Sequence, residues 1–229
     1  MNQIRRRILE SAGVLLATAA LPALSAELLP TPAQMRGPFY PSRIPLDKDN
    51  DLVRVRGRPG VAFGHIVDIS GRIVDARGRP QAGVNVEIWQ VNGYGRYHHE
   101  HDDQNLPLDP NFQGYGLAIT DAEGAYRFRT VKPVAYPGRA PHIHFALTRQ
   151  DVGTFSTQMY LAGAPENNHD FLLSRIANRK ARESLIVPLT PSTANTGESS
   201  TTFDIVLAQD AGLGRSPVPP AYRLARIGL

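Results

Sequence analysis

The chain of 229 residues contains no cysteine. That absence excludes a disulfide-stapled scaffold, a cysteine nucleophile, a zinc ribbon and a cysteine-bound iron–sulfur cluster. Any bound metal ion must therefore be held mainly by histidine, tyrosine, aspartate or glutamate. The sequence also lacks the His-Glu-x-x-His motif that is typical of zinc hydrolases.

The chain has little excess charge, with 25 Lys and Arg against 21 Asp and Glu. Arg5, Arg6, Arg7 and Glu10 place two of the four net positive charges in the first 26 residues. The arginines that follow are scattered instead of clustered on one element, which is the distribution of a solvated surface. We therefore expect no nucleic-acid partner.

Residues 1–26 have the composition of a leader. Arg5–Arg7 precede the apolar stretch Ala12–Leu24, which is too short and too rich in alanine to span a bilayer, and small residues follow. The string Arg5–Leu9 is similar to a twin-arginine export signal; an ordinary secretory signal or an amphipathic helix is the alternative. We predict export to the periplasm by the twin-arginine route. No later segment could cross a membrane, so we expect no stable membrane span after processing.

Residues 27–229 are predicted to form one domain. With 41% hydrophobic and 20% charged residues, the chain can bury a real core. Residues 27–59 are rich in proline and are expected to wrap over the surface. Polar and apolar residues then alternate over Val84–Trp89, as in a strand with one buried face. Further strands are predicted near residues 65–74, 126–128, 142–147, 157–161 and 202–207.

Helical spacing of apolar residues occurs only over Asp170–Ala181, and Pro191–Thr202 has the composition of a polar loop. Many short strands separated by Gly and Pro turns favour an all-β fold. We predict a β-sandwich core with long functional loops and one short helix.

Two groups of histidines could carry chemistry. His142 and His144 are two residues apart in a predicted strand, so both imidazoles point to the same face and could share one metal ion. The alternative is a pair of half-exposed histidines. His98, His99 and His101 could form a zinc or copper site, but a solvated loop is the favoured interpretation of these three.

Tyr97 and Tyr136 lie in predicted loops, beside glycine and arginine. Tyrosine usually fills core or surface positions, and neither residue taken alone indicates a ligand. A phenolate is nevertheless a hard anionic donor, and two of them would favour a trivalent hard metal such as Fe(III).

The chain resembles the intradiol ring-cleavage dioxygenases, and most of all the iron-binding chains of the protocatechuate 3,4-dioxygenases. The resemblance covers roughly residues 36–207 and includes an ordered pattern of two tyrosines followed by Arg-x-x-His-x-His. The segments that carry it are Val86–Tyr97, Leu108–Phe112, Tyr126–Pro133 and Tyr136–Phe145.

The resemblance implies a single catalytic domain that cleaves a catechol with O₂, between its two hydroxyl-bearing carbons, to a cis,cis-muconate-type dicarboxylate. It implies Fe(III) as cofactor, with Arg139 beside the substrate and Tyr136 both a ligand and a general base. The implied metal ligands are Tyr97, Tyr136, His142 and His144. The implied substrate contacts are Gly37, Pro38, Phe39 and Gln158.

In two-chain members of the family the Gly-Pro-aromatic turn comes from the subunit without iron. Here Gly37–Phe39 and the implied ligands share one polypeptide, which favours a single-gene enzyme and a homo-oligomer. The chain departs from the family in having only five residues between Tyr136 and His142, and Gly138 where close relatives carry a large aromatic residue. A non-catalytic, transthyretin-like β-sandwich that binds a partner is the main alternative.

Overall fold

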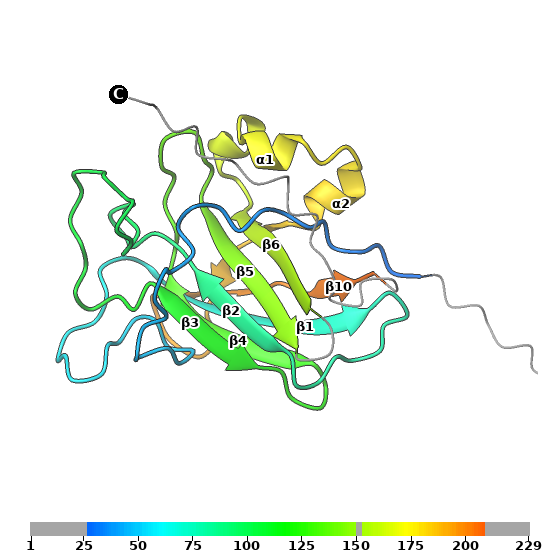
Figure 1. The fold of residues 1–229 in the computed structure, drawn as a ribbon, viewed down its shortest axis with the longest axis horizontal. Coiled ribbons are helices and arrows are strands. Elements are labelled where there is room, and N and C mark those ends of the chain that lie inside the picture. The colour runs from blue at the N-terminus through cyan, green and yellow to red at the C-terminus, as the bar shows by residue number, and fades with distance from the viewer. Residues whose placement is uncertain (1–26, 150–152, 209–229) are drawn as a thin grey trace, which may run out of the picture.

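Two five-stranded sheets form the body of the computed structural model, which describes residues 27–149 and 153–208 (Figure 1). The predicted leader, residues 1–26, lies outside the described residues. In the first sheet β1 (Ile66–Asp75) is central: β4 (Ala125–Val131) pairs antiparallel along one edge, and β9 (Ser199–Thr202) and β10 (Ile205–Leu207) pair parallel along the other. The short strand β8 (Thr190–Pro191) completes this sheet beside β9.

The second sheet has the order β3-β2-β5-β6-β7. Its strands are β3 (Tyr115–Ile119), β2 (Asn85–Trp89), β5 (His142–Arg149), β6 (Gly153–Leu161) and β7 (Ile186–Val187). Alternate apolar side chains of both sheets meet in one buried cluster, which includes Ile69, Ile88, Phe145 and Ile205. Each such side chain contributes about 1.5–3 kcal/mol when it leaves water. The predicted all-β sandwich is confirmed.

Strand β5 is buried on both faces. Ile143, Phe145 and Leu147 point into the core between the sheets, while His142 and His144 lie on the opposite face, since side chains alternate along a strand. Loops cover that opposite face, and the two histidines are only 1% and 3% exposed. The alternative of a half-exposed histidine pair is therefore wrong.

The N-terminal segment of residues 27–59 wraps over the sheets, as predicted. Thr31 N–H donates to the carbonyl of Val206 in the first sheet, and Gln34 N–H donates to the carbonyl of Ser156 in the second, at 2.9 and 2.8 Å. This segment, blue in Figure 1, passes close to β5 and β6. It thereby brings the turn that follows Gln34 over the face of the sheet that carries the histidines.

The prediction of one helix over Asp170–Ala181 is wrong. Two short helices, α1 (Phe171–Ser174) and α2 (Arg179–Glu183), follow the 3₁₀ turn η1 (Pro165–Asn168). The side chain of Asn178 accepts a hydrogen bond from Ala181 N–H and so begins a new helix inside the predicted one. None of the helices in residues 27–149 and 153–208 is long and apolar enough to cross a membrane.

The C-terminal part of the fold also differs from expectation. The predicted strand near 202–207 is divided into β9 and β10, and β9 begins inside the stretch predicted as a loop. The division has a local cause: Asp204 turns its carboxylate to accept a hydrogen bond from Arg72 N–H at 2.8 Å. Strand β3 was not predicted, because its Tyr-Gly-Leu-Ala-Ile sequence alternates weakly.

Candidate metal centre

A tight turn before β5 brings Tyr136 and Arg139 together. Arg139 N–H donates to the carbonyl of Tyr136 at 2.9 Å, and Gly138 has φ +79°. Proline at the second position and a positive φ at the third define a type II turn. The five-residue connection to His142 is therefore a compact turn. The space beside Gly138 is open, but its φ would strain any larger residue.

Four side-chain donor atoms meet at the start of β5. The distances are 3.1 Å from Tyr97 Oη to His144 Nε2, 3.2 Å from His144 Nε2 to His142 Nε2, and 3.4 Å from His142 Nε2 to Tyr136 Oη. Ligands about 2.0–2.1 Å from a common ion lie about 3.0–3.4 Å from one another. The four atoms thus have the mutual spacing of a coordination shell.

The two histidines are prepared as neutral donors. His142 Nδ1–H donates to the carbonyl of Ala140 at 2.6 Å, so its Nε2 carries the lone pair that faces the cluster. Burial, together with the positive charge of Arg139, lowers the pKa of His142 to about 3. Burial, together with His142 and Arg139, holds the pKa of His144 well below its usual value. Both imidazoles can therefore bind a metal at neutral pH without first losing a proton.

The two tyrosines differ in their surroundings. Tyr97 is 3% exposed, and burial with Tyr136 nearby raises its pKa well above the usual value. Burial also raises the pKa of Tyr136, although Arg139 acts in the opposite direction. Two phenols held against two imidazole lone pairs need a cation to become phenolates. The residues therefore fit a hard metal ion, with two nitrogen and two oxygen donors.

The alternative zinc or copper site is not supported. His99 and His101 have ring centroids 5.2 Å apart, and His99 packs edge-on against Phe39. Across residues 27–149 and 153–208, no group of three His, Asp or Glu side chains is placed to hold a metal ion. His98, His99 and His101 thus belong to the loop, and a site at β5 depends on its tyrosines.

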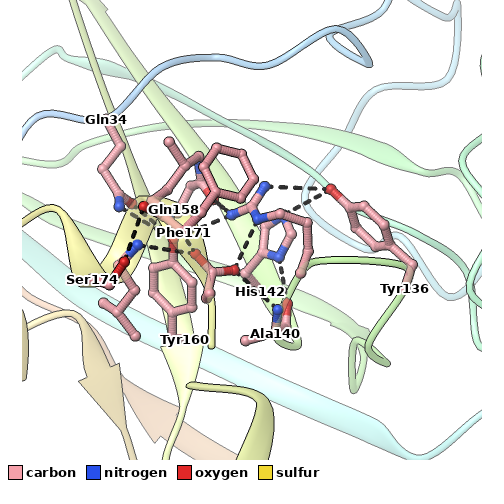
Figure 2. Close-up of polar contacts among 12 residues, drawn as sticks. Gln34, Tyr136, Ala140, His142, Gln158, Tyr160, Phe171 and Ser174 are labelled. Carbon is pink, nitrogen blue, oxygen red and sulfur yellow. Dashed lines mark hydrogen bonds and ion pairs between the residues drawn. The ribbon is translucent and has the colours of Figure 1, made fainter. Parts of the chain in front are cut away.

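Arg139 lies beside the donor cluster in a buried polar network. Its Nη1 is 3.4 Å from Tyr136 Oη, and its Nη2 donates to Gln158 Oε1 at 2.5 Å. Figure 2 shows Tyr136 and His142 on one side of this network and Gln158 on the other. The predicted arginine and glutamine are thus brought to the same place.

The Gly-Pro-aromatic turn covers the other side of the cluster. A Cβ on Gly37 would lie 3.4 Å from His144 Cε1, and Phe39 stacks on Tyr97 with ring centroids 4.5 Å apart. Pro38 between them is exposed. The turn therefore packs against the rings of two predicted ligands.

Several residues of the site were missed by reasoning from the sequence. Trp89 stacks on the His144 ring at 4.8 Å, Tyr160 lies in the network around Arg139, and Asp170 forms an ion pair with Arg139 at 2.8 Å. Two signals existed. Tyr160 follows Gln158 by two residues in a strand and so shares its face. Asp170 immediately precedes an apolar helical stretch, as helix-capping residues do.

The fold and the cluster together define a two-sheet β-sandwich with a Tyr₂His₂ donor set. A protein-family model described as "Dioxygenase" matches residues 35–209. The chain is 40% identical over 168 residues to the protocatechuate 3,4-dioxygenase beta chain of Burkholderia cepacia, which covers 69% of this chain and 71% of that protein. It therefore belongs to the intradiol ring-cleavage dioxygenases.

More distant members are similar too. Catechol 1,2-dioxygenase of Candida albicans is 28% identical over 158 residues. The match covers 61% of this chain and 50% of that enzyme. The solved dioxygenase domain from Streptomyces sp. SirexAA-E is 27% identical with a TM-score of 0.61, covering 78% of this chain and 98% of that one. Since these relatives are dioxygenases, the alternative of a non-catalytic binding module is not supported.

Proposed function

We propose that this chain uses O₂ to cleave a catechol between its two hydroxyl-bearing carbons, giving a cis,cis-muconate-type dicarboxylate. The proposed cofactor is Fe(III), held by Tyr97, Tyr136, His142 and His144. The observation that carries the proposal is the convergence of these four donor atoms beside the guanidinium of Arg139. Each donor atom lies 3.1–3.4 Å from the next.

The donor set argues for iron in the ferric state. Two phenolates are hard, anionic ligands, and they favour a trivalent over a divalent or softer ion. Bound by these residues, iron(III) would supply a Lewis acid that coordinates the catechol and makes its ring reactive toward O₂. The chain's own part is to position the ring and to handle protons and charge.

Tyr136 is proposed as the general base. Its oxygen is 3.4 Å from both His142 Nε2 and Arg139 Nη1. The phenol oxygen can therefore move away from the metal donors while it keeps its contact with Arg139. Its side chain is also only partly buried, whereas Tyr97 is enclosed beneath Phe39. A phenolate at position 136 would accept a proton from an incoming catechol, and Arg139 would stabilise negative charge that develops on the ring.

Gly37, Pro38, Phe39 and Gln158 are proposed to contact the substrate. The open space beside Gly138 leaves room for a ring substituent. Protocatechuate, catechol, hydroxyquinol and chlorinated or lignin-derived catechols are therefore the substrates to compare. Export of the enzyme to the periplasm and assembly as a homo-oligomer remain part of the proposal, on the grounds of the leader and of the single-chain site.

The colour of the purified protein tests the proposed centre. Iron(III) bound to tyrosinate absorbs visible light, so the protein should be reddish and contain about one iron per chain. Tyr97→Phe and Tyr136→Phe should each shift or weaken the absorption band. Tyr94→Phe is the matched control, because Tyr94 is 38% exposed and stacks on Phe63 away from the cluster.

Oxygen uptake with a panel of catechols tests the activity itself. The proposal expects uptake of one O₂ per catechol and a ring-opened dicarboxylate as product. A colourless, iron-free protein from iron-replete cells would contradict the proposed centre. A coloured protein that consumes no O₂ with any catechol would contradict the proposed reaction.

A further inference from the structure

The carboxylate of Asp170 is buried, and both of its oxygens accept hydrogen bonds. Asp170 is 1% exposed and caps α1, where its Oδ1 accepts hydrogen bonds from the N–H groups of Leu172 and Leu173 at 3.0 Å each. Its Oδ2 accepts from Ala140 N–H at 3.0 Å and from Arg139 Nε at 2.8 Å. One side chain thus ties the first helix to the turn that precedes β5.

These contacts keep Asp170 ionised. Burial acts to raise the pKa of Asp170, but the N–H of Leu173 and the charge of Arg139 outweigh it, and the pKa lies below its usual value. A buried carboxylate with four N–H partners holds its position closely. It is therefore a rigid anchor and not a mobile counter-ion.

The anchor acts on the edge of Arg139 that faces away from the metal donors. Arg139 Nε donates to Asp170, while Nη2 donates to Gln158 and, at 3.3 Å, to the hydroxyl of Tyr160. Only Nη1 is directed to Tyr136. Because the guanidinium is planar and its donors form a rigid fork, holding Nε and Nη2 determines where Nη1 lies.

We propose that Asp170 is a positioning residue, which holds the Arg139 guanidinium in the orientation that meets charge on the substrate. This inference rests on the proposed function, since it assigns Asp170 a part in the same reaction. Asp170 contacts neither the four donor atoms nor the predicted substrate contacts Gly37–Phe39. Its effect on catalysis passes through Arg139.

The chain contains a matched carboxylate for comparison. Asp75 is also buried, at 8% exposed, accepts hydrogen bonds from the backbone N–H groups of Arg77 and Arg79, and pairs with Arg79 Nε at 2.6 Å. It lies at the end of β1 in the other sheet. Asp75→Asn therefore removes a carboxylate–arginine pair with backbone hydrogen bonds without touching the site, although Arg79 is exposed where Arg139 is buried.

The test compares iron-loaded wild type, Asp170→Asn and Asp75→Asn. An amide has one acceptor oxygen, so the substituted side chain cannot serve both the helix and Arg139. We expect both variants to lower Tm, and only Asp170→Asn to lower kcat/KM for a cleaved catechol, by about 10–100-fold and mainly through kcat. Iron content and visible absorption should stay at the wild-type level. A wild-type kcat/KM in Asp170→Asn would overturn the inference.

A double-mutant cycle isolates the route through Arg139. In an Arg139→Ala background there is no guanidinium to misplace, so adding Asp170→Asn should change kcat/KM by less than about threefold. Adding it should also lower Tm less there than in the wild type, because Arg139→Ala has already removed the ion pair that Asp170→Asn breaks. Equal losses of kcat/KM in both backgrounds, or additive effects on Tm, would show that Asp170 does not act through Arg139.

A second variant tests the same contact if Asp170→Asn does not fold. Asp170→Glu keeps the charge but moves it by one methylene, so it should lower kcat/KM where Asp170→Asn does not fold; a wild-type value would overturn the inference. The double-mutant cycle in Tm needs no substrate, so it measures the coupling between Asp170 and Arg139 even if no catechol is cleaved. Absence of O₂ uptake by the wild type contradicts the proposed function instead.

Discussion

Binding of Fe(III) to the metal-free protein should release protons from tyrosine but not from histidine. Burial and Arg139 lower the pKa of His142 to about 3, and the pKa of His144 is also well below its usual value. At pH 7 both imidazoles are already neutral. Burial raises the pKa of Tyr97 and of Tyr136, so each phenol must lose a proton when it becomes a ligand. We expect about two protons per iron from these side chains.

The size of the effect follows from linkage. The metal-free state binds more protons than the metal-bound state, so the apparent affinity rises with pH, by one logarithmic unit per pH unit for each proton released. Two tyrosines therefore give about a 100-fold increase between pH 6.5 and 7.5, equivalent to about 2.7 kcal/mol. A bound water that ionises adds the same increment to every variant and cancels in comparisons.

The measurement is a competition titration against one chelator between pH 6 and 8, followed by visible absorption. Tyr97→Phe removes one titrating ligand, so the slope of log affinity against pH should fall by about one. His144→Gln removes a ligand that carries no proton at these pH values, so it should weaken binding and leave the slope unchanged. An unchanged slope in Tyr97→Phe, or a reduced slope in His144→Gln, would refute the reasoning.

Two further predictions concern the sandwich that supports the site. Phe145 is fully buried against Phe203 and Tyr126, so Phe145→Ala should lower the free energy of unfolding by about 3–5 kcal/mol in urea denaturation; a loss below about 1 kcal/mol would contradict its place in the core. A Cβ on Gly71 would lie 2.0 Å from the Phe203 carbonyl oxygen, so Gly71→Ala should cost about 1–3 kcal/mol, and wild-type stability would argue against that close approach.

Local patterns in the sequence were enough to predict most strands and the pairing of His142 with His144. A strand repeats every two residues, so the common face of these histidines follows from spacing alone. Burial of that face does not follow from spacing, because it depends on the segment of residues 27–59, which bonds to β6 and brings Gly37 against His144. For the same reason the half-exposed alternative could not be dismissed from the sequence.

The helical region shows where pattern reasoning fails. Apolar spacing predicted one helix over Asp170–Ala181, but side-chain caps at Asp170 and Asn178 begin two separate short helices. Capping depends on which conformation the neighbouring chain imposes, and here Asp170 is held from outside by Arg139 and Ala140. A contact made across thirty residues thus sets the start of α1.

The sequence by itself determined the chemistry of the donors: without cysteine, a metal site must use nitrogen and oxygen ligands, and the order of tyrosines and histidines carries the family resemblance. Only the tertiary structure decided that Tyr97 meets His144 at 3.1 Å and that Asp170 holds Arg139. The physical reason is the distance along the chain over which each effect acts. Spacing sets side-chain direction within one strand or turn, whereas convergence of distant segments requires the packing of the two sheets and of the loops that cover them.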